Sequence, residues 1–211
     1  MRPQRHPDIH SEKALSIEDV SFVVLDLETT GVRPADDEIL AIGAVRMRGT
    51  RILIGQTFYR LVAPERARWD ATVAVHRLRP QDVAHALTVR DVWPLFQEFC
   101  EGSVLVGYRV RLDRAFLKRV ALRGDAWARA HIWIDVHKLS MWLERGRFRW
   151  PWQREEVALE ELAQRYGLPL LQRHHALADA LLTAQIFQRL LLAARERRVR
   201  RLADLCRVAE V

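Results

Sequence analysis

Residues 22–31 read Phe-Val-Val-Leu-Asp-Leu-Glu-Thr-Thr-Gly, and this stretch decides the fold. Its apolar, β-branched first half predicts a buried β-strand. Successive side chains of a strand point to opposite faces, so Asp26 and Glu28 share one face. Two such carboxylates at the end of a buried strand repel each other and are costly to desolvate unless a cation lies between them. Oxygen ligands without cysteine or histidine favour Mg²⁺ or Mn²⁺ over zinc.

The chain around this strand alternates between β-rich and helical patterns. Two β-rich runs flank Arg48-Gly49-Thr50 and predict a hairpin, and two short apolar runs follow; the strands expected after the first are 39–45, 51–59, 104–107 and 132–134. Apolar spacing predicts helices over 74–78, 89–99, 112–120, 136–143, 157–166, 176–192 and 195–207. A three-stranded meander followed by β-α-β-α units indicates an α/β fold, a mixed five-stranded sheet flanked by helices.

Length and charge suggest one domain with a polyanionic partner. At 211 residues and 49% hydrophobic content, we expect a flexible N-terminal arm (1–19), one domain (20–193) and a basic C-terminal helix or tail (194–211). The formal net charge of +7 comes almost entirely from arginine. That excess favours nucleic acid, although a GC-rich genome also enriches arginine.

Cysteine use and hydropathy point to an intracellular protein. Cys100 and Cys206 lie in apolar helical contexts, which suits reduced thiols. We expect no apolar run as long as a membrane span, and the N-terminus lacks the apolar core of a signal peptide. The protein is therefore expected to be cytoplasmic, without a membrane partner.

Two further acids lie where this topology brings them towards the first pair. Asp113 opens the helix after strand 104–107, and Asp179 lies inside the helix over 176–192. With these acids the chain resembles the DEDD superfamily of 3′-to-5′ exonucleases, in particular its histidine subclass, which includes the proofreading epsilon subunit of DNA polymerase III. Residues 26–31 match the first motif in full, and His174, Ala176 and Asp179 match the third.

The second motif departs from the family pattern. It keeps Gly107 and Asp113 but has Tyr108-Arg109 where the family usually has His-Asn. Arg109 either brings a cation to a site that already gathers positive charge, or turns outward to a phosphate.

The resemblance implies an RNase H-like fold and two-metal-ion hydrolysis of phosphodiester bonds. Asp26, Glu28 and Asp179 would hold a first Mg²⁺ or Mn²⁺. Asp26 would bridge to a second ion, which Asp113 would support directly or through water. A histidine would take the proton from the attacking water.

Two adjacent histidines compete for the role of general base. The family spacing selects His174, on a loop or first turn before the helix. Helical periodicity alone would select His175, which lies four residues from Asp179 and therefore on the same helix face.

By the same resemblance, the main chain of Leu27, Thr29 and Thr30 would contact the 3′-terminal nucleotide, although both threonines also suit an ordinary turn. His76 stands where relatives carry a substrate-side His-Gly-Ile segment, and is equally explained as a helix-surface histidine. The run 145–154 interleaves arginines with Phe148, Trp150 and Trp152. This composition suits a single-strand binding loop, or rings that cover the end of the sheet.

We therefore expect a metal-dependent 3′-to-5′ exonuclease that releases nucleoside 5′-monophosphates from single-stranded DNA ends. An RNA-trimming exoribonuclease is the enzymatic alternative, because no residue here discriminates a 2′-hydroxyl. The alternative from another class is a nucleic-acid-binding or polymerase-associated scaffold with a weakened site. A DNA polymerase complex is thus a candidate partner beside single-stranded 3′ ends.

Overall fold

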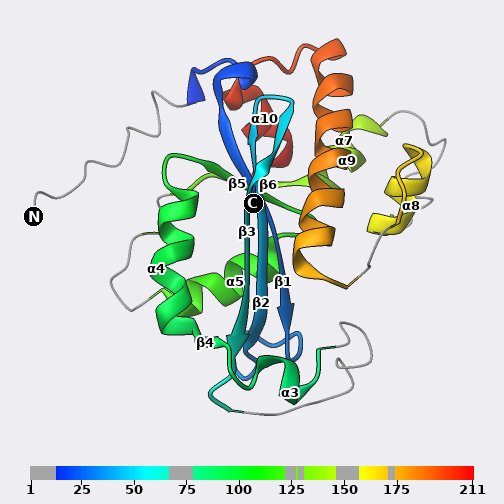
Figure 1. The fold of residues 1–211 in the computed structure, drawn as a ribbon. Coiled ribbons are helices and arrows are strands. Elements are labelled where there is room, and N and C mark those ends of the chain that lie inside the picture. Colours follow the sequence, from blue (N-terminus) through cyan, green and yellow to red (C-terminus); the bar gives the residue numbers. More distant parts are fainter. Residues whose placement is uncertain (1–12, 67–77, 122–126, 128–130, 146–156, 171–173) are drawn as a thin grey trace, which may run out of the picture.

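A mixed sheet of six strands, in the order β4-β3-β2-β1-β5-β6, forms the centre of the molecule (Figure 1). The computed structural model describes residues 13–66, 78–121, 127, 131–145, 157–170 and 174–211. The strands are β1 (Ser21–Thr29), β2 (Ile39–Arg48), β3 (Arg51–Ala63), β4 (Leu87–Thr88), β5 (Val104–Gly107) and β6 (Trp133–Asp135). The first three are antiparallel neighbours, whereas β5 is parallel to β1 and β6 is parallel to β5.

The α/β class is confirmed, but the expected number of five strands is wrong. The additional strand, β4, has two residues, which pair in parallel with Val62 and Ala63 at the end of β3. Both residues of β4 are exposed, and a strand of two residues is too short to show apolar alternation in the sequence. This strand exists because it pairs with the distant β3, and no local sequence pattern predicts it.

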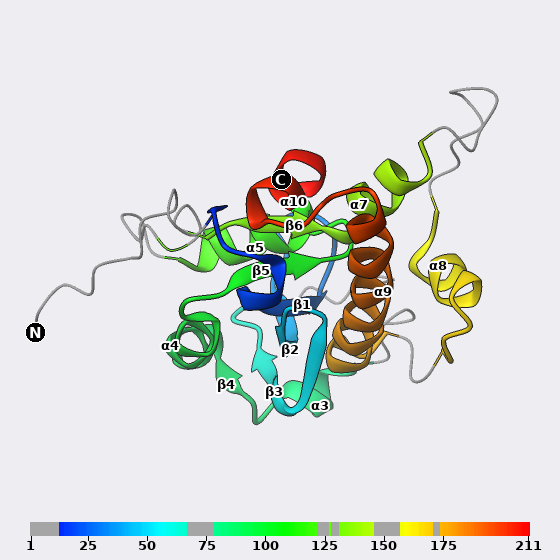
Figure 2. The same cartoon turned by 90° about the horizontal axis from the view of Figure 1, so that it is seen from above.

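Helices cover both faces of the sheet (Figure 2). Alternate residues of β1 face the two layers. Val23 and Leu25 pack in one core with α4 and α5, whereas Phe22 and Val24 pack in the other with α7, α9 and α10. The helices are η1 (Ile17–Asp19, 3₁₀), α3 (Pro80–Val83), α4 (Val89–Cys100), α5 (Arg111–Val120), α7 (Val136–Leu143), α8 (Leu159–Arg165), α9 (Ala176–Glu196) and α10 (Leu202–Ala209).

Helix α9 is the main support of the second face. By length and composition alone its 21 residues could cross a membrane, contrary to the expectation that no apolar run is long enough. Its buried side chains pack instead on β1 and β2, and Phe187 meets Phe22 edge-on with ring centroids 5.3 Å apart. Packing against the sheet therefore explains why this helix is apolar.

The ends of the described chain belong to the same core. The predicted single helix over 195–207 is wrong: α9 runs to Glu196, Arg198 adopts a left-handed φ of 65°, and α10 begins at Leu202. Part of the expected N-terminal arm also packs, since Ile17 is buried and its N–H donates to the Arg200 carbonyl at 2.9 Å. Most of the arm, the helix expected near 74–78 and most of the run 145–154 lie outside the described residues.

Candidate active site

The first two acids of the site continue the α9-facing row of β1. Phe22 and Val24 fill the core beneath α9, and the alternation of the strand places Asp26 and Glu28 on the same face beyond them. Glu28 is 9% exposed, and Asp26 is half-buried. Apolar residues thus anchor the strand, and carboxylates occupy its end.

A glycine on the neighbouring strand lets α9 approach these acids. Gly43 pairs directly with Asp26 across β1 and β2. A Cβ at this position would lie 2.2 Å from the main-chain carbon of Ala176, at the first residue of α9. The first residue of α9 therefore packs directly against β2. Asp179, one turn later and only 5% exposed, thereby lies close to Asp26 and Glu28.

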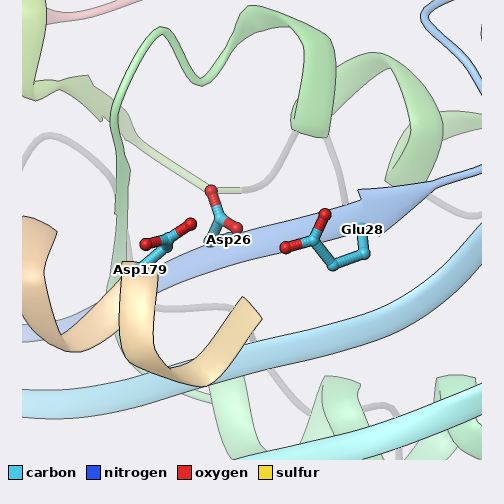
Figure 3. A group of neighbouring side chains, drawn as sticks. All are labelled: Asp26, Glu28 and Asp179. Atoms are coloured by element: carbon cyan, nitrogen blue, oxygen red, sulfur yellow. The ribbon is translucent and has the colours of Figure 1, made fainter. Parts of the chain in front are cut away.

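Asp26, Glu28 and Asp179 form one carboxylate cluster (Figure 3). Each offers an oxygen, and these oxygens all lie within 4.8 Å of one another. The three side chains line a cleft of about 450 Å³ that also contains Leu27, Arg109 and His174. Three carboxylates this close together in a partly desolvated site repel one another, and a divalent cation between them would offset that repulsion. Because all the ligand atoms are oxygens, the group suits Mg²⁺ or Mn²⁺.

The two adjacent histidines take different positions. His174 lines the cleft in a left-handed conformation with φ of 62°, and its main-chain N–H donates to Oδ2 of Asp179 at 3.1 Å. His175 is the N-cap of α9: its Nδ1 accepts from the N–H of Ala178 at 3.4 Å, and its ring stacks on Tyr59 with centroids 4.5 Å apart. Of the two, His174 is the histidine that lines the cleft.

Asp113 lies beside the cluster but does not line the cleft. It sits in the first turn of α5, and its pKa is raised to about 7, chiefly by burial of the carboxyl and also by the nearby Asp135. Hydrogen bonds from the main chain of Asp113 and of Leu27 oppose that rise in pKa. Through Leu27, Asp113 therefore contacts the strand segment between Asp26 and Glu28.

The residues expected to contact substrate separate into three groups. Leu27 and Arg109 line the cleft. Thr29 and Thr30 make turn contacts: the Thr29 hydroxyl donates to the Gly31 carbonyl at 2.6 Å, and the Thr30 hydroxyl accepts from the N–H of Glu38 at 2.9 Å. His76, Phe148, Trp150 and Trp152 lie outside the described residues.

Four residues that line the cleft were not among the expected ones: Tyr108, Ala158, Leu159 and Glu160. Tyr108 follows β5; its hydroxyl donates to the Val157 carbonyl, and burial raises its pKa to about 12. Glu160, in the first turn of α8, adds a fourth carboxylate to the lining. Tyr108 stands in the second motif, whereas Glu160 carries no sequence signal of its own, because only the fold brings the start of α8 close to Tyr108.

The family assignment follows from a comparison with family models. The exonuclease family RNase_T matches residues 23–187, which include the carboxylate cluster and His174. The chain belongs to this exonuclease family, as the three motifs led us to expect.

Two curated relatives that carry DNA polymerase III names are much longer than this chain. DNA polymerase III PolC-type from Thermotoga maritima is 31% identical over 173 residues, which cover 81% of this chain and 12% of that protein. The DNA polymerase III subunit epsilon-like protein of Rhodobacter capsulatus is 35% identical over 184 residues, covering 86% of this chain and 25% of that relative. The chain thus spans a quarter or less of the length of these two relatives.

Solved structures support the RNase H-like fold. Escherichia coli exonuclease I in complex with a dT13 oligonucleotide superposes with a TM-score of 0.69 at 20% identity, covering 86% of this chain and 42% of that one. Exonuclease X in complex with 5′-overhanging duplex DNA gives a TM-score of 0.64 at 23% identity, covering 82% of this chain and 93% of that one. At these identities the likeness establishes the fold.

Proposed function

We propose that this chain is a divalent-cation-dependent 3′-to-5′ exonuclease that hydrolyses phosphodiester bonds at the 3′ end of single-stranded DNA and releases nucleoside 5′-monophosphates. The observation that carries the proposal is the convergence of Asp26, Glu28 and Asp179 within 4.8 Å in a cleft that His174 also lines. Membership of an exonuclease family supports the same reaction.

Asp26, Glu28 and Asp179 would hold Mg²⁺ or Mn²⁺, with Asp113 next to them as a supporting acid. When bound, two such ions shield the phosphate charge, make water more acidic and stabilise the leaving oxygen. The carboxylates supply what that requires, a rigid group of oxygens on a strand and a helix that pack against each other.

His174 would take the proton from the attacking water. Histidine is the side chain that most often serves as a general base in enzymes. The hydrogen bond from the main chain of His174 to Asp179 holds it at the edge of the cluster. His175 is engaged with Ala178 and Tyr59, so it serves the helix end and not the reaction.

DNA is the proposed substrate because exonuclease I and exonuclease X were solved with DNA, and the curated relatives carry DNA polymerase names. Those names also make a DNA polymerase the proposed protein partner. The rate of degradation of matched DNA and RNA oligonucleotides tests the substrate class. A preference for RNA would replace the DNA assignment with that of an exoribonuclease.

The decisive experiment compares turnover of a labelled single strand in Mn²⁺ by the wild type and by Asp26→Ala. We expect the wild type to release mononucleotides from the 3′ end and the variant to lose turnover. Glu101→Gln, at an exposed acid after α4, is the matched control and should behave as wild type. Absence of turnover by the wild type in Mg²⁺ and in Mn²⁺ would instead favour a nucleic-acid-binding scaffold.

A further inference from the structure

Arg109 occupies a backbone conformation that suits arginine poorly. Its φ is 51°, in the left-handed region, which asparagine, aspartate and glycine enter more readily than a long side chain does. The main-chain N–H of Arg109 donates to Oδ1 of the buried Asp135 at 3.1 Å. Asp135 also caps α7 by accepting a hydrogen bond from the N–H of His137. A residue outside the turn therefore fixes the backbone conformation of Arg109. Such an imposed conformation at the edge of a cleft suggests a functional role for the side chain.

An anchored tyrosine supports the Arg109 guanidinium. Its Cζ lies 5.8 Å from the centroid of the Tyr108 ring, and its positive charge lowers the pKa of the Tyr108 hydroxyl against the larger effect of burial. The same hydroxyl donates to the Val157 carbonyl, just before α8. Tyr108 thus presents the guanidinium from a fixed wall of the cleft.

The residues that line the cleft carry mostly negative charge, which makes the Arg109 guanidinium important for binding a phosphate. The described residues that line it include four carboxylates, those of Asp26, Glu28, Glu160 and Asp179. Among these described lining residues, Arg109 carries the only permanent positive charge. A phosphodiester that enters the cleft is repelled by the acids, and a planar guanidinium can offset that repulsion by donating two parallel hydrogen bonds to phosphate oxygens.

We propose that Arg109 is the phosphate-binding residue of this cleft and holds a backbone phosphate of the 3′-terminal segment independently of divalent cations. The proposal rests on the proposed function, because it assigns a substrate contact within the same site. It also explains how Arg109, which stands where the family usually has asparagine, can contribute to the reaction by binding substrate.

The test measures binding of a fluorescent oligothymidylate by anisotropy in EDTA, over a series of salt concentrations, to wild type, Arg109→Asn and Arg111→Asn. Asparagine tolerates the left-handed backbone, so Arg109→Asn should preserve the fold. Arg111 is exposed at the first residue of α5 and, unlike Arg109, is not among the lining residues; Arg111→Asn therefore removes the same charge outside the cleft.

We expect Arg109→Asn to weaken binding about tenfold and to lower the slope of log affinity against log salt by about 0.7, the value for one phosphate contact on a single strand. Arg111→Asn should change affinity by less than about twofold. In Mn²⁺, Arg109→Asn should raise KM more than it lowers kcat.

Two outcomes overturn the assignment: equal losses in both variants, which would indicate general surface charge, or unchanged binding in Arg109→Asn. If the wild type degrades the strand while either outcome holds, the Arg109 proposal alone fails. If the wild-type protein neither binds Mn²⁺ nor degrades the strand, the proposed function itself is wrong.

Discussion

The main-chain N–H of His174 donates a 3.1 Å hydrogen bond to Oδ2 of Asp179, across the start of α9. This contact joins the histidine of the cleft to a carboxylate of the proposed cation site. Because His174 has a left-handed φ of 62°, it lies outside the regular helix and is free of helical spacing. The hydrogen bond therefore links the position of His174 to that of Asp179.

Removal of the proposed general base should affect chemistry and not cation binding. We expect His174→Ala to lower kcat by about 10²–10⁴-fold with Mn²⁺ affinity largely unchanged. His175→Ala should leave turnover nearly intact and cost about 0.5–1 kcal/mol of stability, because the N-cap contact to Ala178 is lost. Single-turnover rates, Mn²⁺ calorimetry and urea unfolding separate these effects. Similar losses of turnover in both variants would contradict the assignment.

Divalent cations should stabilise the folded chain through the carboxylate cluster. At 100 times its dissociation constant, Mn²⁺ should add about 2.7 kcal/mol to the free energy of unfolding, and EDTA should remove this gain together with turnover. Asp26→Asn and Asp179→Asn should each lose most of the stabilisation by Mn²⁺. Without cations, both variants should be at least as stable as wild type, because carboxylate repulsion is relieved. Thermal unfolding with and without Mn²⁺ measures both effects, and undiminished stabilisation in either variant would rule out the cluster as the site.

Asp113 should make the metal-free protein less stable as the pH rises. Its pKa in the folded chain is about 7 against an ordinary value of 3.8, so the folded state favours the neutral acid. The associated stability is present below about pH 4 and is lost as the pH rises towards 7. Relative to Asp113→Asn, the wild type should lose stability on the order of a few kcal/mol over this range. Urea unfolding of both proteins in EDTA at pH 4.5 and pH 7 measures the difference, and parallel pH profiles would disprove the effect.

A methyl group at Gly43 should displace the start of α9. Its Cβ would meet the Ala176 main chain at 2.2 Å, and backbone cannot yield as a flexible side chain does. We expect Gly43→Ala to destabilise the fold by about 1–3 kcal/mol and to weaken Mn²⁺ binding, because Asp179 moves with the helix. Gly55→Ala is the matched control, since a Cβ there has no atom within 4 Å and should leave both quantities unchanged. Equal behaviour of the two variants would show that the close approach at Gly43 is unimportant.

The sequence alone determined the features that depend on neighbours along the chain. The period-two pattern of β1 set Asp26 and Glu28 on one face, and helical spacing placed Asp179 on an apolar helix. These patterns are local because backbone geometry fixes where each side chain points. The fold class followed from the order of such elements.

Only the tertiary structure decided the features that depend on distant contacts. The approach of α9 to Gly43 placed Asp179 beside Asp26, and the capped, stacked position of His175 left His174 to line the cleft. The two-residue strand β4 and the inclusion of Glu160 in the cleft likewise have no local pattern. The physical reason is the same in each case: packing between segments far apart in the chain sets these positions, and periodicity within one segment carries no information about it.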